Sequence, residues 1–136
     1  IETGLLPGAL LRNKKLRFIS KNIFLKVTNT NNKFCINYKS KNIIKLPIAH
    51  NEGNYFAQKE LLNELEEKNL VAFKYCDSNG TIDEENNPNG SSNNIAGILN
   101  DKKNILGMMP HPERLIDPFL SGEDGSIMFE SLLKIN

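Results

Sequence analysis

The residues best suited to chemistry are a histidine and a glutamate two positions apart in the segment GMMPHPER, residues 107–114. An imidazole exchanges protons near neutral pH, and a neighbouring carboxylate can set its tautomer and stabilise its charged form. His111 and Glu113 therefore match the base and the orienting acid of a nucleophile–base–acid triad. The competing interpretation is a solvated histidine in a surface loop, because an isolated His-x-Glu also occurs by chance.

The elements around this segment should aim both side chains at one place. The apolar run at Ile105–Met109 follows a polar turn and predicts a buried strand that ends just before the histidine. Pro112 disfavours a helical backbone at His111. Side chains two apart on an extended chain point to the same side, so His111 and Glu113 are expected to face one site.

A second His-x-Glu pair, His50 and Glu52, follows a predicted strand at 43–49. His50 is a weak candidate for binding substrate. The alternative is a capping or hydrogen-bonded histidine in a glycine-rich turn. A third hypothesis brings the two His-x-Glu pairs together as a zinc site, since imidazole and carboxylate are both acceptable zinc ligands.

The remaining pattern predicts an α/β fold. Strands are expected at 23–27 and 71–75, with a hairpin formed by 95–99 and 105–109. A leucine stripe predicts a helix over 58–68, with Glu64 and Lys68 as an i,i+4 pair. Asp124 is the expected N-cap of a last helix. Residues 77–94 form a long polar loop, which is typical of either a functional or a disordered segment.

Composition limits the function classes. The chain has 136 residues, a net charge of +1, 39% hydrophobic and 24% charged residues, and two cysteines. Its lysines are scattered rather than clustered with aromatic residues, which argues against nucleic-acid binding. No apolar run reaches membrane-spanning length. Two cysteines without a CxxC motif favour a reducing compartment, so we expect a soluble, cytoplasmic protein.

Four ordered segments carry a family resemblance. GMMPHPER resembles the C-terminal catalytic signature of class I glutamine amidotransferases, and most closely that of the PurQ-like glutaminase subunits of phosphoribosylformylglycinamidine synthase. The other segments are GLLPGALLRN at 4–13, PIAHNEGNY at 47–55, and NPNGS at 87–91 with IAG at 95–97. The resemblance implies an α/β fold with an open, mostly parallel sheet and flanking helices. Residues 1–136 would be the C-terminal portion of one such domain.

The resemblance also implies an activity and its catalytic residues. Enzymes of this family hydrolyse glutamine to glutamate and ammonia with a Cys-His-Glu triad, in which His111 and Glu113 would be the last two members. The ammonia would pass to a synthetase subunit, PurL, with the small adaptor PurS, to amidate formylglycinamide ribonucleotide. ATP and Mg²⁺ would be used by the synthetase, and no cofactor is expected in this chain.

The family's nucleophile is a cysteine on a glycine-flanked strand-to-helix turn, and this sequence departs from that pattern. Neither Cys35 nor Cys76 is flanked by glycines. The resemblance therefore implies that the nucleophile lies outside these 136 residues and that the chain alone is inactive. A different possibility is a non-catalytic, glutaminase-like binding subunit that retains only a docking surface.

Overall fold

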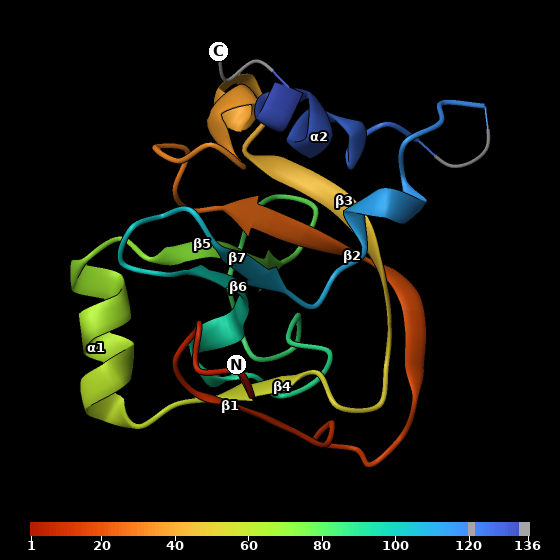
Figure 1. Cartoon of the computed structure of the whole chain (residues 1–136). Coiled ribbons are helices and arrows are strands. Elements are labelled where there is room, and N and C mark those ends of the chain that lie inside the picture. Colours follow the sequence, from red (N-terminus) through yellow and green to blue (C-terminus); the bar gives the residue numbers. More distant parts are fainter. Residues whose placement is uncertain (120–121, 134–136) are drawn as a thin grey trace.

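The computed structural model describes residues 1–119 and 122–133. Its centre is a five-stranded sheet in the order β3-β2-β5-β6-β7, and a separate two-stranded sheet pairs β1 with β4 (Figure 1). The strands are β1 Ala9–Leu11, β2 Ile19–Val27, β3 Ile43–His50, β4 Asn54–Phe56, β5 Val71–Cys76, β6 Ile95–Leu99 and β7 Leu106–Met108. The helices are α1 Lys59–Glu67 and α2 Ser126–Leu133, with 3-10 turns η1 Ile36–Ser40, η2 Ser92–Asn94 and η3 Pro112–Arg114.

The strand pairings of the described residues differ from the mostly parallel sheet that the resemblance implies for the whole domain. In the described part of the chain every paired strand runs antiparallel to its neighbour. A short connection explains this result for β6–β7, where only residues 100–105 join the strands, since antiparallel neighbours can be joined by a tight link whereas parallel ones need a long crossover. The hairpin predicted from residues 95–99 and 105–109 is confirmed as β6 and β7.

The core lies along the middle of the five-stranded sheet. In β2 and β3 buried and more exposed residues alternate, as expected for strands with one covered face. The inner strand β6, between β5 and β7, is buried at all five positions, so both of its faces are covered. The largest fully buried apolar side chains are Tyr38, Phe73, Tyr75, Leu25, Ile44, Leu46, Ile48, Leu65, Ile95 and Leu99.

Helix α1 confirms the helix predicted from the leucine stripe. Leu65 is buried, and Leu61 and Leu62 pack against the core from the same helix. Lys68 follows the last helical residue and places its Nζ 2.6 Å from an Oε of Glu64, as the i,i+4 spacing predicted. Both charged side chains are about half exposed, so the pair contributes at most about 0.5 kcal/mol.

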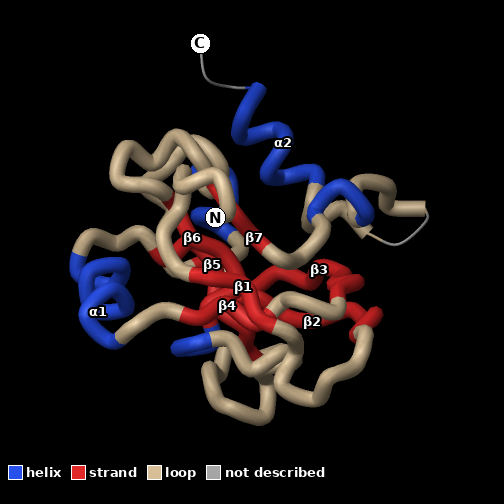
Figure 2. Tube along the Cα trace, turned by 60° about the horizontal axis from the view of Figure 1, so that its bottom comes forward, coloured by secondary structure: helices blue, strands red, loops and turns tan. Residues whose placement is uncertain are grey.

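Asp124 does not cap α2 as predicted. The helix begins at Ser126, and the Asp124 carboxylate instead accepts hydrogen bonds from the Lys41 ammonium and from the backbone N–H of Lys45. The charged lysine and the backbone donor at the start of β3 compete successfully for the carboxylate because such charge-assisted bonds are stronger than neutral ones. Figure 2 shows α1 and α2 at separate edges of the molecule.

The edges of the structure are less covered than its centre. Strand β7 was predicted to be buried, but all three of its residues are half-buried because it is the last strand of the sheet. The small β1–β4 sheet exposes Leu10, Leu11 and Phe56. Among the described residues no helix is long and apolar enough to cross a membrane.

The long polar loop predicted at 77–94 is folded by its own amide side chains. Asn87 Oδ1 accepts hydrogen bonds from the backbone N–H groups of Gly90 and Ser91. Asn89 is fully buried and donates to the Tyr75 hydroxyl at 2.9 Å. Side-chain-to-backbone bonds of this kind replace the ladder that a loop lacks. The second half of the loop, which contains the buried Asn89 and Ser91, is therefore a packed part of the domain, whereas most of the first half is exposed.

Candidate functional site

His111 and Glu113 meet as the sequence predicted. The Nδ1 atom of His111 lies 2.8 Å from an Oε of Glu113. The two side chains are 31% and 55% exposed, so the ring is reachable from solvent. An ionised carboxylate can only accept a hydrogen bond, so Nδ1 carries the proton in this contact. That tautomer leaves Nε2 with a free lone pair, the form required of a general base.

The backbone achieves this contact differently from the predicted extended chain. His111 itself is non-helical, with φ −105° and ψ 87°, but Pro112 to Arg114 form the 3-10 turn η3. Proline at the first position of a helical turn loses no hydrogen bond and has the required φ. The turn folds Glu113 back toward the histidine ring. Pro112 therefore starts a tight turn after the histidine, in addition to restricting the residue before it.

Backbone hydrogen bonds tie both His111 and the segment before it to strands of the sheet. The N–H of His111 donates to the carbonyl of Pro47 in β3 at 2.8 Å, and the N–H of Met109 donates to the carbonyl of Ala96 in β6 at 3.0 Å. Because β3 is an edge strand, Pro47 can lack an N–H without breaking the sheet. The site is thus built on strands rather than on a free loop.

The second histidine lies at the end of the same edge strand. His50 is only 8% exposed, and neither of its ring nitrogens has a hydrogen-bond partner among the described residues. Burial lowers the pKa of His50 below its usual value, and a positive charge on His111 would lower it further. The ring lies directly over Gly53, where a Cβ would overlap it. The sequence suggested a capping or hydrogen-bonded histidine as the alternative to substrate binding. That alternative is corrected, because the His50 side chain makes no hydrogen bond to the described residues.

Asn13 is a residue to which the sequence assigned no role. Its side chain is fully buried. Its amide nitrogen donates to the carbonyls of His50 and Arg17 at 2.9 and 2.8 Å, and its amide oxygen accepts from the N–H of Gly53 at 3.0 Å. The position belongs to the segment GLLPGALLRN, so the family resemblance could have drawn attention to it, but its partners are distant in sequence.

The two His-x-Glu pairs do not form a metal site. Glu52 is exposed and lies near Arg12, with the closest N–O distance at 3.8 Å, while the His50 ring is buried. Across the described ranges no three His, Cys, Asp or Glu side chains are grouped so that they could hold a metal ion. The pairs fail to converge because Glu113 is engaged by His111 and Glu52 points toward a cation instead.

Neither cysteine is suited to act as a nucleophile. Cys35 is fully buried in the core, and burial raises the pKa of its thiol to about 12. Cys76 is also buried, and burial raises the pKa of its thiol to about 11. A reactive cysteine needs a lowered pKa, because the thiolate is the attacking species. The environments of Cys35 and Cys76 act in the opposite direction.

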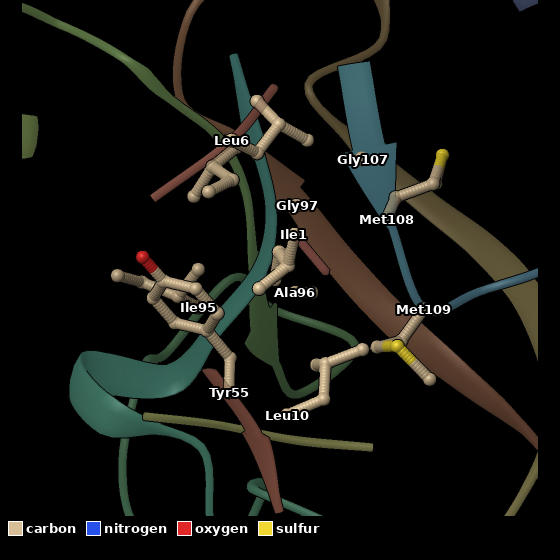
Figure 3. A pocket seen from close by; sticks show the side chains of 11 residues that line it. Ile1, Leu6, Leu10, Tyr55, Ile95, Ala96, Gly97, Gly107, Met108 and Met109 are labelled. Carbon is tan, nitrogen blue, oxygen red and sulfur yellow. The ribbon is translucent and has the colours of Figure 1, made fainter. Parts of the chain in front are cut away.

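An apolar cavity of about 150 Å³ lies between the β1–β4 sheet and strands β6 and β7 (Figure 3). Leu6, Leu10 and Tyr55 form one side of it, and Ala96 and Met109 contribute to the other. Met109 is two residues from His111. However, a polar substrate such as glutamine needs convergent polar groups to fix its orientation. The apolar lining makes this cavity a gap between packed elements rather than the chemical site.

Comparisons with known proteins agree with these features. Residues 3–123 match the family model described as the CobB/CobQ-like glutamine amidotransferase domain. The chain is 56% identical over 133 residues to phosphoribosylformylglycinamidine synthase subunit PurQ of Pelagibacter ubique, and 53% identical over 132 residues to the PurQ subunit of Gloeobacter violaceus. These alignments cover 98% and 97% of this chain but 58% and 57% of the relatives.

A solved structure supports the same relationship. The structure of PurLQS from Thermotoga maritima contains a chain that matches with a TM-score of 0.79 and 36% identity, over 97% of this chain and 54% of that one. The chain therefore spans just over half the length of the relatives it matches. The fold is glutamine amidotransferase-like, and the chain belongs to the CobB/CobQ-like glutamine amidotransferase domain family.

Proposed function

We propose that residues 1–136 are the C-terminal portion of a glutaminase domain that hydrolyses glutamine to glutamate and ammonia. The observation that carries the proposal is the 2.8 Å contact between His111 Nδ1 and a Glu113 carboxylate oxygen, which presents Nε2 as a base. The buried, high-pKa thiols of Cys35 and Cys76 support a nucleophilic cysteine supplied by sequence outside these residues.

In the first half of the reaction His111 Nε2 takes the proton of that cysteine's thiol. The thiolate attacks the carboxamide carbon of glutamine, and a tetrahedral intermediate forms. His111 then returns its proton to the amide nitrogen, the carbon–nitrogen bond breaks, and ammonia leaves. Glu113 holds the ring in one tautomer throughout and offsets the positive charge of the imidazolium.

In the second half His111 removes a proton from water, which attacks the glutamyl thioester. The carbon–sulfur bond breaks, glutamate is released, and the cysteine regains a proton from His111. The partial exposure of the His111 ring supports this step, because water must reach Nε2. Hydrogen-bond donors near the cysteine would stabilise the oxyanion.

The proposed partners follow from the relatives. The PurQ relatives are subunits of phosphoribosylformylglycinamidine synthase, and the solved neighbour is a chain of a PurLQS structure. We infer that ammonia made by the intact domain passes to a PurL-type synthetase subunit, with PurS as adaptor. ATP and Mg²⁺ would act at the synthetase.

The test measures glutamate release by two proteins, each mixed with the synthetase subunit. One is the protein encoded by the reading frame extended upstream of Ile1, and the other is the 136-residue chain. We expect activity only from the extended protein. Replacing the glycine-flanked cysteine in its added segment with alanine should abolish that activity. Glutaminase activity of the 136-residue chain would overturn the external nucleophile. An extended protein that is inactive yet binds the synthetase would favour the non-catalytic binding subunit.

A further inference from the structure

The turn at the end of β3 is bound by a single residue, Asn13, from a distant segment. Asn13 uses both its amide nitrogen and its amide oxygen to bind this turn, at the carbonyl of His50 and the N–H of Gly53. The backbone N–H of Asn13 also donates to the carbonyl of Asn51 at 2.9 Å. His50, Asn51 and Gly53 are thus all hydrogen-bonded to one residue from a distant segment.

The turn in question carries the His50 ring. The residue is 8% exposed, and its two ring nitrogens are unpaired in the described structure. A buried polar group without a partner is costly, so such a group needs a fixed surrounding to persist. Gly53 supplies part of that surrounding, because only a residue without a Cβ fits against the ring. Asn13 supplies the rest by fixing Gly53 and His50 relative to each other.

The same strand carries the attachment point of His111. The carbonyl of Pro47, three residues before His50, accepts the N–H of His111, so both histidines are attached to β3. The remaining charged group of the turn, Glu52, is exposed and paired with Arg12. A movement of the turn would therefore change the surroundings of His111 through His50 and β3.

We propose that Asn13 is a positioning residue of the glutaminase site, which fixes the His50–Gly53 turn at the end of the strand whose Pro47 carbonyl binds the backbone of His111. The proposal rests on the glutaminase function proposed above. Asn13 does not touch the reacting atoms in this scheme. Its contribution is to hold one wall of the site in a single arrangement, on which catalysis depends because small misplacements lower rates strongly.

The chain offers a matched control. Asn89 is equally buried, and its side chain binds two partners, the Tyr75 hydroxyl and the N–H of Ser91, where that of Asn13 binds three. It makes no hydrogen bond to the 50–53 turn in the described structure. Asn89→Ala should therefore lower stability to a similar extent as Asn13→Ala, because each leaves buried polar groups unpaired, without releasing the His50 ring.

The experiment follows the two histidines by NMR in the full-length protein. The signals of these two rings are assigned as those lost in His50→Gln and in His111→Gln variants. Asn13→Ala is expected to raise the pKa of His50 toward its usual value of 6.5 as the ring becomes hydrated, and to lower kcat/KM for glutamine by roughly tenfold or more. Asn89→Ala is expected to leave the His50 titration unchanged.

Other outcomes are equally decisive. An unchanged His50 titration in a folded Asn13→Ala protein would overturn the positioning role, whatever happens to activity. An equal change in both variants would also overturn it, since it would mark general loosening. Asn13→Ser, which retains one polar atom, covers the case in which alanine prevents folding. An inactive parent protein in which the His50 titration still responds to Asn13→Ala would contradict the glutaminase proposal alone.

Discussion

The backbone N–H of His111 donates to the carbonyl of Pro47 across 2.8 Å, and this bond joins the C-terminal turn to the edge strand β3. A partly exposed histidine is thereby held at a fixed place on the sheet. Proline at position 47 retains its carbonyl for this purpose although it lacks an N–H of its own. The candidate site thus depends on a rigid element, which is where precise geometry is best maintained.

His111→Ala in the full-length protein is expected to lower glutamine hydrolysis by roughly 10³-fold or more, because no other group would accept the thiol proton. The side chain is partly exposed and its contact with Glu113 is at the surface, so stability should change by less than about 1 kcal/mol. Glutamate release and thermal unfolding measure the two effects. Near-normal turnover in the variant would contradict the assignment of His111.

Glu113→Gln tests the role of the carboxylate. The amide can donate a hydrogen bond to Nδ1, which favours the tautomer with the proton on Nε2 and removes the base. We expect kcat to fall by roughly 10²- to 10⁴-fold with little change in KM. Lys68→Gln, which removes the exposed ion pairs of Lys68 with Glu64 and Asp101, is the control and should leave kcat intact. Equal activity of the two variants would remove Glu113 from the mechanism.

Cys35 and Cys76 are expected to resist alkylation. Burial raises the pKa values of these thiols to about 12 and about 11, so the reactive thiolate is scarce at a pH of about 7.5. Iodoacetamide labelling followed by mass spectrometry should show slow modification in the native protein and rapid modification in urea. Fast labelling of either residue under native conditions would show that its thiol is accessible and ionised.

Burial of His50 should make stability depend on pH. Its folded pKa is lowered from the usual 6.5, so the folded state binds the proton less readily than the unfolded chain. The free energy of unfolding is therefore unaffected by protonation of His50 above about pH 6.5, and it decreases as the pH falls from there through the folded pKa of His50. The free energy lost is about 1.4 kcal/mol for each pH unit that separates the folded and unfolded pKa values. Urea unfolding at about pH 7.5 and about pH 5.5 measures the loss.

His50→Gln supplies the control for this pH dependence, since glutamine does not titrate. The loss of stability between these two pH values should be smaller in this variant than in the unaltered protein. His111→Gln should retain the larger loss, because His50 is still present. If His50→Gln showed the same pH dependence as the parent, the source would lie in other groups.

Local sequence was sufficient for some of these features. The leucine stripe at 58–68 predicted α1, and the two apolar runs at 95–99 and 105–109 predicted the β6–β7 hairpin, because side-chain periodicity reports directly which face an element buries. The contact between His111 and Glu113 was also predictable, because Pro112 restricts the backbone between them and side chains two residues apart can point to the same side. Its route through a 3-10 turn was not.

Other features depended on contacts between distant segments. Nothing near Asp124 in the chain indicates that its carboxylate binds Lys41 and Lys45 instead of capping α2. The antiparallel pairing of β2 with both β3 and β5, and the hold of Asn13 on the turn at His50, likewise join residues far apart in sequence. Local patterns determine which residues an element buries, but the partners of a polar side chain are decided only when the packed chain brings competing donors and acceptors together.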